Sequence, residues 1–336
     1  MGVNHENADA LLGAWALDAL DDAQRAELDE ALAGSERLRR AAEGLQHAVA
    51  LLGELDADAP PPTVRARLLS EIRRCPAATA HVIPSSPVDV VGAQIDAVRA
   101  LLESLRPQDW QAQAAPYPWS VHGLAAHLLV SERYTAHVLG LEQFDGFGAD
   151  ADDRDHLALG AAIIEAEVGR PPAHTAAEWH ARASATIGAV GAWPPPERER
   201  SVSFHGWPLS VSAVLIVRGF EMWTHADDIR RATGRPVEAP APSDLRAMST
   251  YSVNSLPLLV PQLSHRSARV VLTGPGGGTF DLGMPSGERA LTLVADVVDY
   301  CRLVARRIEP DDLRSTTEGD RGLARELMAA SRVFAM

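Results

Sequence analysis

Two residues about two-thirds of the way along the chain have the types and the spacing that suit metal chemistry. Glu221 and His225 are four positions apart in a predicted helix that ends at Gly234, and residues at this spacing share one helix face. Val214 and Val217 precede them on that face, so we expect it to point inward. A buried charge is costly unless it is paired or bound to a cation. The pattern therefore suits chelation of a metal ion, and it also fits a buried Glu–His hydrogen bond or a partly solvated face.

A third candidate donor lies in another predicted helix, which begins near residue 121. His127 stands between Leu124 and Leu128 on the apolar stripe of that helix. A lone histidine in such a place is more often a satisfied core residue than a ligand. Together with Glu221 and His225, however, it completes a set of two histidines and one glutamate. Such a set suits Zn²⁺ and leaves a coordination position for water or substrate.

Amphipathic helices must position these donors, and the sequence predicts enough of them for a helical bundle. His122 and His137, in the second of these helices, lie nearer its polar side and are expected at the surface. The predicted helices of the bundle domain, residues 88–236, span about 88–105, 121–141, 156–168, 175–192 and 210–234.

Residues 237–336 have a different pattern, which predicts a small α+β domain. A helix precedes two strand-like runs, ARVVLTG and GTFDLGM, and two further helices complete the chain. The glycine-rich GPGGG between the runs is expected to be a hairpin turn, because it lacks the Lys-Ser/Thr ending of a phosphate-binding loop. The fold class is therefore mainly α with an α+β C-terminal domain.

The N-terminal part reads as a third, small helical domain over residues 1–53. Asp21 or Asp22 can cap one of its helices and Gly34 can end it. Residues 54–87 are rich in Pro and Ala and are predicted to be a linker.

Composition narrows the function classes. The net charge of −14 over 336 residues argues against a general nucleic-acid binder. No apolar run is long enough to cross a membrane and the N-terminus has no signal-peptide pattern. The two cysteines, Cys75 and Cys301, lie far apart and indicate a reducing compartment without a disulfide framework. We therefore expect a cytoplasmic protein.

Three motifs in order give residues 88–336 a resemblance to a known family. PWSVHGLAAHL, RGFEMWTHADDIRRATGRP and VVDYCRLVARRIEPDDL resemble the mycothiol-dependent maleylpyruvate isomerases, which combine a DinB-like four-helix bundle with a C-terminal α+β domain. The resemblance implies that His127, Glu221 and His225 bind zinc. It also implies a role for Arg302 in binding the anionic substrate or the thiol cofactor, although a plain surface arginine on this helix is about as good an interpretation.

The same resemblance implies a mechanism. Zinc with an open position would hold the thiol of mycothiol as a thiolate, the form that attacks an electrophilic carbon of a small unsaturated acid. Asp228 could orient a ligand, but an exposed residue near the helix end is the favoured interpretation. Tyr117, Trp119 and Trp223 could line the pocket or pack in the core. Cys301 is expected to pack rather than react.

The first 70 or so residues resemble a different family, the zinc-type anti-sigma factors. The positions of that family's histidine and two cysteines are held here by Ala31, Ser35 and Leu38, so we predict no zinc in this segment. The missing ligands do not exclude binding of a sigma factor, because these helices could still present an apolar groove to it.

Three functions therefore compete. The first is a zinc- and mycothiol-dependent isomerase or transferase with a small-molecule substrate. The second is a regulator that binds a sigma factor, with the metal bundle as sensor or scaffold. The third is a metal-binding structural protein without turnover. Metal analysis, a sigma-factor pull-down and thiol-dependent turnover would separate them.

Overall fold

In a computed structural model, the chain forms two compact units, Met1–Pro76 and Ala77–Met336. Each unit is described by itself. The structure describes residues 5–16, 19–35, 37–42, 44–45, 82–142, 156–284 and 289–332. Most of the predicted linker, the acidic stretch before residue 156 and Cys75 lie outside these residues.

The N-terminal unit begins with two helices, α1 (His5–Ala16) and α2 (Asp22–Gly34). Asp21 caps α2, since its carboxylate accepts from the backbone N–H of Gln24 while the Gln24 side chain accepts from the backbone N–H of Asp21. A small apolar core is formed by Leu12, Leu28, Ala31, Leu38 and Ala42. Two of the three positions where the anti-sigma family has ligands, Ala31 and Leu38, are therefore apolar core residues that cannot coordinate a cation.

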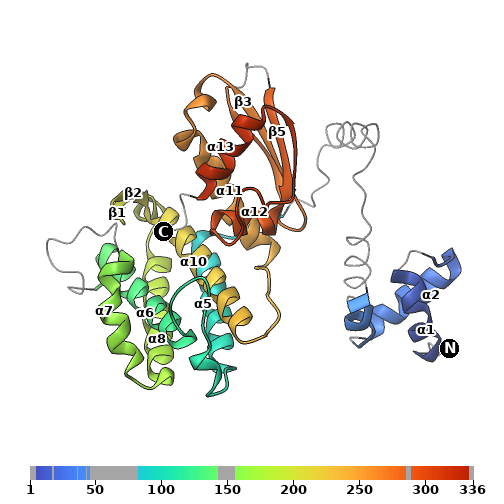
Figure 1. The fold of residues 1–336 in the computed structure, drawn as a ribbon, viewed down its shortest axis with the longest axis horizontal. Coiled ribbons are helices and arrows are strands. Elements are labelled where there is room, and N and C mark those ends of the chain that lie inside the picture. The colour runs from blue at the N-terminus through green and yellow to red at the C-terminus, as the bar shows by residue number, and fades with distance from the viewer. Residues whose placement is uncertain are drawn as a thin grey trace. The chain divides into compact units, whose positions relative to one another are not determined.

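The second unit contains the bundle that sequence periodicity predicts (Figure 1). Helix α10 packs along α5, α8 packs against both α5 and α6, and α7 packs against α6. Serines cap three of the helices, with Ser86, Ser120 and Ser210 each accepting from a backbone N–H in the first turn. The helices are α5 (Pro87–Glu103), α6 (Val121–Val138), α7 (His156–Val168), α8 (Pro172–Ala192) and α10 (Val211–Ala232), with the short helices η1 (Asp109–Gln111) and α9 (Pro195–Arg198) in the connections.

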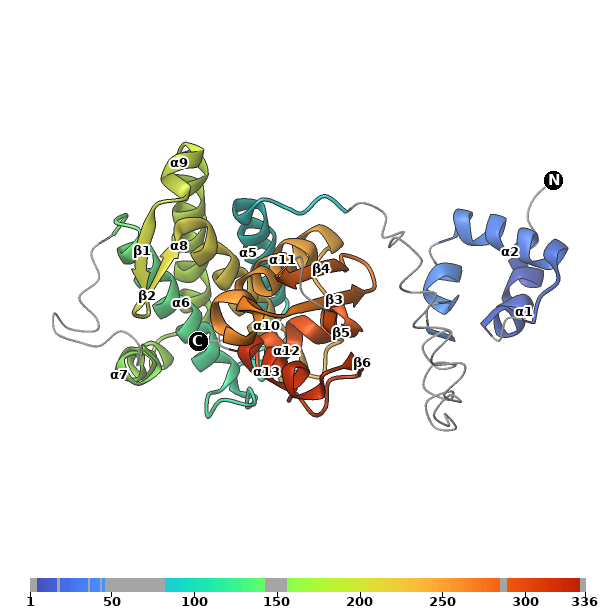
Figure 2. The same ribbon diagram turned by 90° about the horizontal axis from the view of Figure 1, so that it is seen from above.

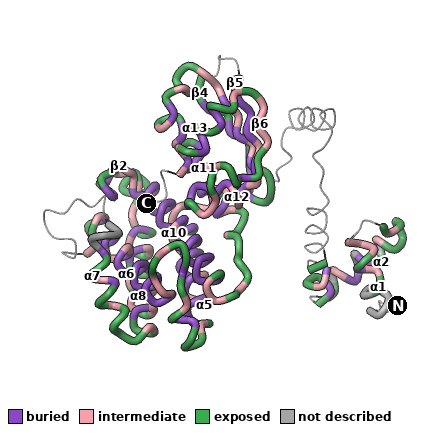
Figure 3. Tube along the Cα trace, in the orientation of Figure 1, coloured by how far each residue is buried: buried purple, intermediate pink, exposed green. Residues whose placement is uncertain are grey.

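A β-hairpin delivers the chain to α10. Strands β1 (Ser201–Phe204) and β2 (Trp207–Ser210) pair antiparallel, where the sequence predicts only a short extended or turn segment. Helix α10 follows directly and is buried over most of its length (Figure 3).

The C-terminal part is a four-stranded sheet covered by helices, in strand order β4-β3-β5-β6. Strands β3 and β4 form the predicted antiparallel hairpin, β5 lies parallel to β3, and β6 is antiparallel to β5. Buried and exposed residues alternate along β3 and β4, so one face is covered; helices α11, α12 and α13 pack against the sheet. The elements are α11 (Pro242–Leu259), η3 (Pro261–Ser264), β3 (Ser267–Thr273), β4 (Gly278–Gly283), β5 (Arg289–Asp296), α12 (Val297–Val304), β6 (Ser315–Gly319) and α13 (Arg321–Ser331).

The first of the two helices predicted for the end of the chain was expected over LVADVVDYCRLVARRI, residues 293–308, and this prediction is wrong at its start. Residues up to Asp296 belong to β5, and Asp296 is the N-cap of α12, accepting from the backbone N–H groups of Val298 and Asp299. Strand β6 is also absent from the prediction.

The sheet domain lies against α10 and α5 of the bundle (Figure 2). The two parts share an apolar core. Ile216, Phe220 and Trp223 of α10 belong to the same cluster as Met248 of α11 and Tyr300 of α12. This shared packing fixes α12 relative to the face of α10 that carries the candidate donors. Among the described residues no helix is long and apolar enough to span a membrane.

Candidate metal centre

The three candidate donors, which lie far apart in the sequence, converge inside the bundle. One ligand atom from each of His127, Glu221 and His225 lies within 4.8 Å of the other two. His127 Nε2 is 3.1 Å from Glu221 Oε1, and the two imidazole rings are 5.1 Å apart, edge to face. His127 and His225 are buried, whereas the Glu221 side chain is 21% exposed. The cluster is therefore partly open to solvent through its carboxylate.

A buried arginine holds the second oxygen of Glu221. The guanidinium of Arg218, one turn earlier on α10, pairs with Glu221 Oε2 and lies 3.3 Å from Glu132 Oε2 on α6. Burial alone would raise the pKa of Glu221, but Arg218 and the His127 contact hold it well below its usual range. Glu221 is therefore a carboxylate at neutral pH, with Oε1 directed to the histidines.

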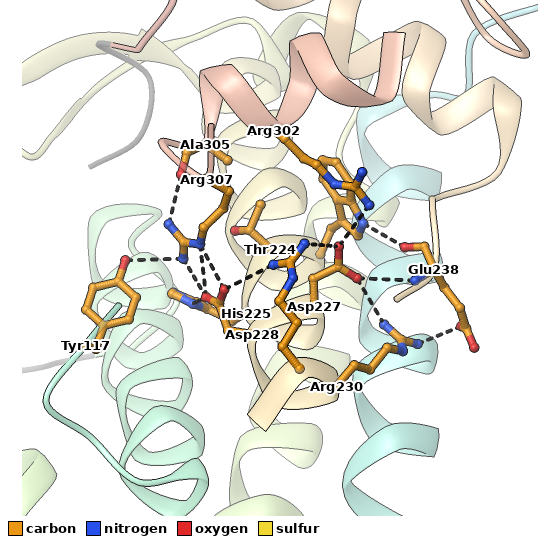
Figure 4. Close-up of polar contacts among 12 residues, drawn as sticks. Tyr117, Thr224, His225, Asp227, Asp228, Arg230, Glu238, Arg302, Ala305 and Arg307 are labelled. Carbon is orange, nitrogen blue, oxygen red and sulfur yellow. Dashed lines mark hydrogen bonds and ion pairs between the residues drawn. The ribbon is translucent and has the colours of Figure 1, made fainter. Parts of the chain in front are cut away.

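His225 is oriented by a carboxylate on the same helix. Its Nδ1 lies 3.3 Å from Asp228 Oδ2, and Arg307 in turn donates to Asp228, with Nη2 2.6 Å from Oδ2 and Nε 2.9 Å from Oδ1 (Figure 4). Burial lowers the pKa of His225, and the hydrogen bond to Asp228 offsets only part of that effect. A neutral ring that donates from Nδ1 leaves the Nε2 lone pair for coordination.

Aromatic rings form one wall of the cluster. Trp119 stacks on His127 with ring centroids 5.0 Å apart, and Tyr117 stacks on Trp119 at the same separation. Tyr117 also meets His225 edge to face at 5.4 Å. Both aromatic residues are half-buried, so the wall restricts access to the donors without sealing them.

The residues present fit a divalent metal ion. Two neutral imidazoles and one carboxylate form the donor set of many zinc enzymes that keep a position open. The non-coordinating atoms of Glu221 and His225 already have partners, Arg218 and Asp228. Supporting contacts of this kind are typical of metal ligands.

Arg302 lies beside a different carboxylate. Its Nη2 is 3.6 Å from Asp227 Oδ2, and Nη1 donates to Asp299 Oδ1 at 3.4 Å. Its Nε is buried without a hydrogen-bond partner among the described residues. Arg307, which no sequence pattern singled out, makes the contact to Asp228 of the His225–Asp228 pair instead.

Several expectations about single residues change. Asp228 is buried, only 2% exposed, so its interpretation as an exposed helix-end residue is wrong. His122 is also buried, with Nε2 3.1 Å from Thr175 Oγ1, because the face of α6 toward α8 is covered; the surface assignment holds only for His137.

Two other side chains pack as core residues. Trp223 is buried and donates to the backbone carbonyl of Glu238, so of the three aromatic candidates only Tyr117 and Trp119 line the site. Cys301 is fully buried and burial raises the pKa of its thiol, which suppresses the reactive thiolate.

The family comparison covers the part of the chain that carries the three donors. Residues 91–230 match the family model described as the mycothiol maleylpyruvate isomerase N-terminal domain. The match covers 140 of the 336 residues and agrees with the resemblance that the sequence motifs predicted for this part of the chain. The matched region does not include the first 90 residues, and their likeness to anti-sigma factors stays a prediction.

Two solved structures are similar at low sequence identity. They are the mycothiol-dependent maleylpyruvate isomerase and a point mutant of it, each 13% identical over 68% of this chain and 91% of theirs, with TM-scores of 0.48 and 0.47. A comparison with curated proteins gives no match.

Proposed function

We propose that this chain is a metal-dependent enzyme that uses a small thiol of the mycothiol type. It either isomerises a small electrophilic acid with the help of the thiol or transfers the thiol to that acid. The observation that carries the proposal is the convergence of His127, Glu221 and His225 within the region that matches the family model. Zinc is the metal that the donor set favours.

Each residue of the centre has a distinct task in this proposal. His127 and His225 would each offer one imidazole nitrogen, and Glu221 offers Oε1 because Arg218 occupies its other oxygen. A bound divalent ion would lower the pKa of the thiol and so hold it as the nucleophilic thiolate. Tyr117 and Trp119 flank the open side and would position the substrate carbon chain against the donors.

Arg302 is the proposed binding residue for the anionic part of the substrate or thiol. Its buried Nε has no partner among the described residues, and its terminal nitrogens make only long contacts of 3.4 and 3.6 Å. A carboxylate bound there would complete the hydrogen bonding of the guanidinium.

A metal measurement combined with thiol-dependent turnover tests the proposal. The purified protein should contain about one zinc ion per chain, and His127→Ala should lose it because a two-donor site binds zinc weakly. Turnover of a maleylpyruvate-like acid should require the thiol and should disappear in Glu221→Ala.

His137→Ala is the matched control, since His137 lies on the same helix but is exposed. It should keep both metal and turnover. Undiminished activity in Glu221→Ala would refute the metal mechanism. Zinc binding without any thiol-dependent turnover would instead favour a structural metal protein.

A further inference from the structure

One arginine from the sheet domain reaches the bundle beside the candidate metal centre. Arg307 follows α12, yet its guanidinium donates to the carboxylate of Asp228 on α10. Its Nε lies 2.9 Å from Oδ1 and 3.2 Å from Oδ2, and its Nη2 lies 2.6 Å from Oδ2. The side chains are 10% and 1% exposed. This is a buried bidentate ion pair, the geometry in which an arginine most strongly fixes the orientation of a carboxylate.

The position of Arg307 is itself fixed by the end of α12. The backbone N–H of Arg307 donates to Arg302 O and that of Arg306 to Leu303 O, and Arg306 has the left-handed φ of 57°. Together these bonds form a Schellman motif. The Ala305 carbonyl also accepts from Arg307 Nη1 at 2.9 Å, so the guanidinium is held at its own end as well as at Asp228.

Tyr117 restrains the guanidinium from the other side. The Arg307 carbon between the nitrogens lies 5.4 Å from the Tyr117 ring centroid, within the range of a cation–π contact. Since Tyr117 also packs edge to face on His225, Arg307 and His225 are linked both through a carboxylate and through a ring (Figure 4).

We infer that Arg307 is a positioning residue that orients His225 through Asp228, so that the sheet domain completes a metal centre whose donors all come from the bundle. The inference rests on the metal site proposed above. Arg307 holds the Asp228 carboxylate where it accepts from His225 Nδ1, and that bond keeps the ring turned with Nε2 toward His127 and Glu221.

A simpler role for the pair would be to join the two domains. That role predicts a loss of stability when Arg307 is replaced, with unchanged metal affinity in the molecules that remain folded. The positioning role predicts a loss of affinity in the folded protein. The readout is therefore the affinity of the full chain for Zn²⁺ alone, measured by competition with a chromophoric chelator well below the unfolding temperature.

In this experiment Arg307→Ala should weaken Zn²⁺ binding by about 10–100-fold, the usual effect of losing a residue that supports a metal ligand. Arg269→Ala is the control, because Arg269 makes an equally two-pronged pair with Asp281, at 2.7 and 2.8 Å, on the exposed part of the sheet. It should leave the affinity unchanged. Should Arg307→Ala fail to fold, Arg307→Gln, which keeps one donor, is measured in its place with the same expectation.

A double variant tests the route through Asp228. In an Asp228→Ala background, replacing Arg307 should cause no further loss, whereas an equal second loss would overturn the inference. Unchanged Zn²⁺ affinity in the folded Arg307 variant would overturn it as well. Failure of the metal site itself would appear differently, as a wild-type protein that binds no Zn²⁺ at this site or binds it equally well after His127→Ala.

Discussion

At the scale of single residues, the centre depends on charges that are buried in pairs. Arg218 is 2% exposed and lies between Glu132 and Glu221, the first of which is also buried. Two carboxylates and one guanidinium leave an excess negative charge that a divalent cation would compensate. The same arrangement that prepares Glu221 as a ligand therefore makes the bundle dependent on Arg218.

Replacing this arginine should destabilise the protein strongly. Arg218→Met should lower the free energy of unfolding by about 3–5 kcal/mol, because it removes the arginine that pairs with the buried carboxylate of Glu132 and with Glu221. Urea denaturation of the metal-free protein measures the change. Arg99→Met is the control, since Arg99 pairs with Glu103 on the surface and such pairs contribute less than about 1 kcal/mol. Equal losses in the two variants would contradict the argument.

The convergence of the three candidate donors could be predicted from sequence because helical spacing places them on inward faces. Glu221 and His225 share a face of α10, and His127 stands in an apolar stripe of α6. Arg307 could not be predicted in the same way, because it meets Asp228 across 79 positions of sequence. The hydrophobic periodicity of a sequence carries no information about contacts between distant segments. Arg218 had a local signal, an arginine on an otherwise apolar helix face.

At the scale of secondary structure, the helix that carries Glu221 and His225, α10, packs closely against α5. A Cβ added to Gly219 of α10 would lie 2.7 Å from Cγ1 of Val90 on α5, and Val90 is fully buried. The absence of a side chain at Gly219 therefore allows the two helices to pack directly before the turn that carries Glu221.

Two glycine substitutions of the same chemical kind should have opposite effects. Gly219→Ala should destabilise the fold by about 1–3 kcal/mol through overpacking against Val90. Gly188→Ala, on an exposed position of α8 with nothing within 4 Å of the new Cβ, should stabilise it by about 0.5–1 kcal/mol through helix propensity. Thermal unfolding of both variants provides the measurement, and a stabilised Gly219→Ala would contradict the close-packing argument.

The strands show where local sequence patterns stop being informative. The hairpin of β3 and β4 was predicted because its pairing is local and its turn is rich in glycine. Strand β5 lies beside β3 in the sheet and parallel to it, although β4 comes between them in the sequence. The apolar residues of β5 run directly into α12. A short apolar run of this kind is consistent with either a strand or a buried helix.

At the scale of the whole chain, every residue assigned to the centre belongs to the unit Ala77–Met336. The N-terminal unit has an apolar core of its own, built on α1 and α2. The two units therefore have separate sources of stability, and nothing in the geometry of the centre requires the first.

Removal of residues 1–76 should consequently leave Zn²⁺ affinity within about twofold of the full chain, since all donors and their supporting contacts remain. Competition with a chelator on both proteins measures it. The truncated protein should also keep any thiol-dependent turnover. A clear drop in affinity would show that the first unit contributes to the centre.

The pairing of Arg307 with Asp228 has a consequence for combining these two domains with domains from related proteins. Because Asp228 lies on α10 and Arg307 follows α12, a chimera that joins this bundle to the sheet domain of a relative would keep the pair only where that domain has an arginine at the matching position. Such hybrids would have to exchange both positions together, and the two halves of the unit are therefore expected to evolve as one.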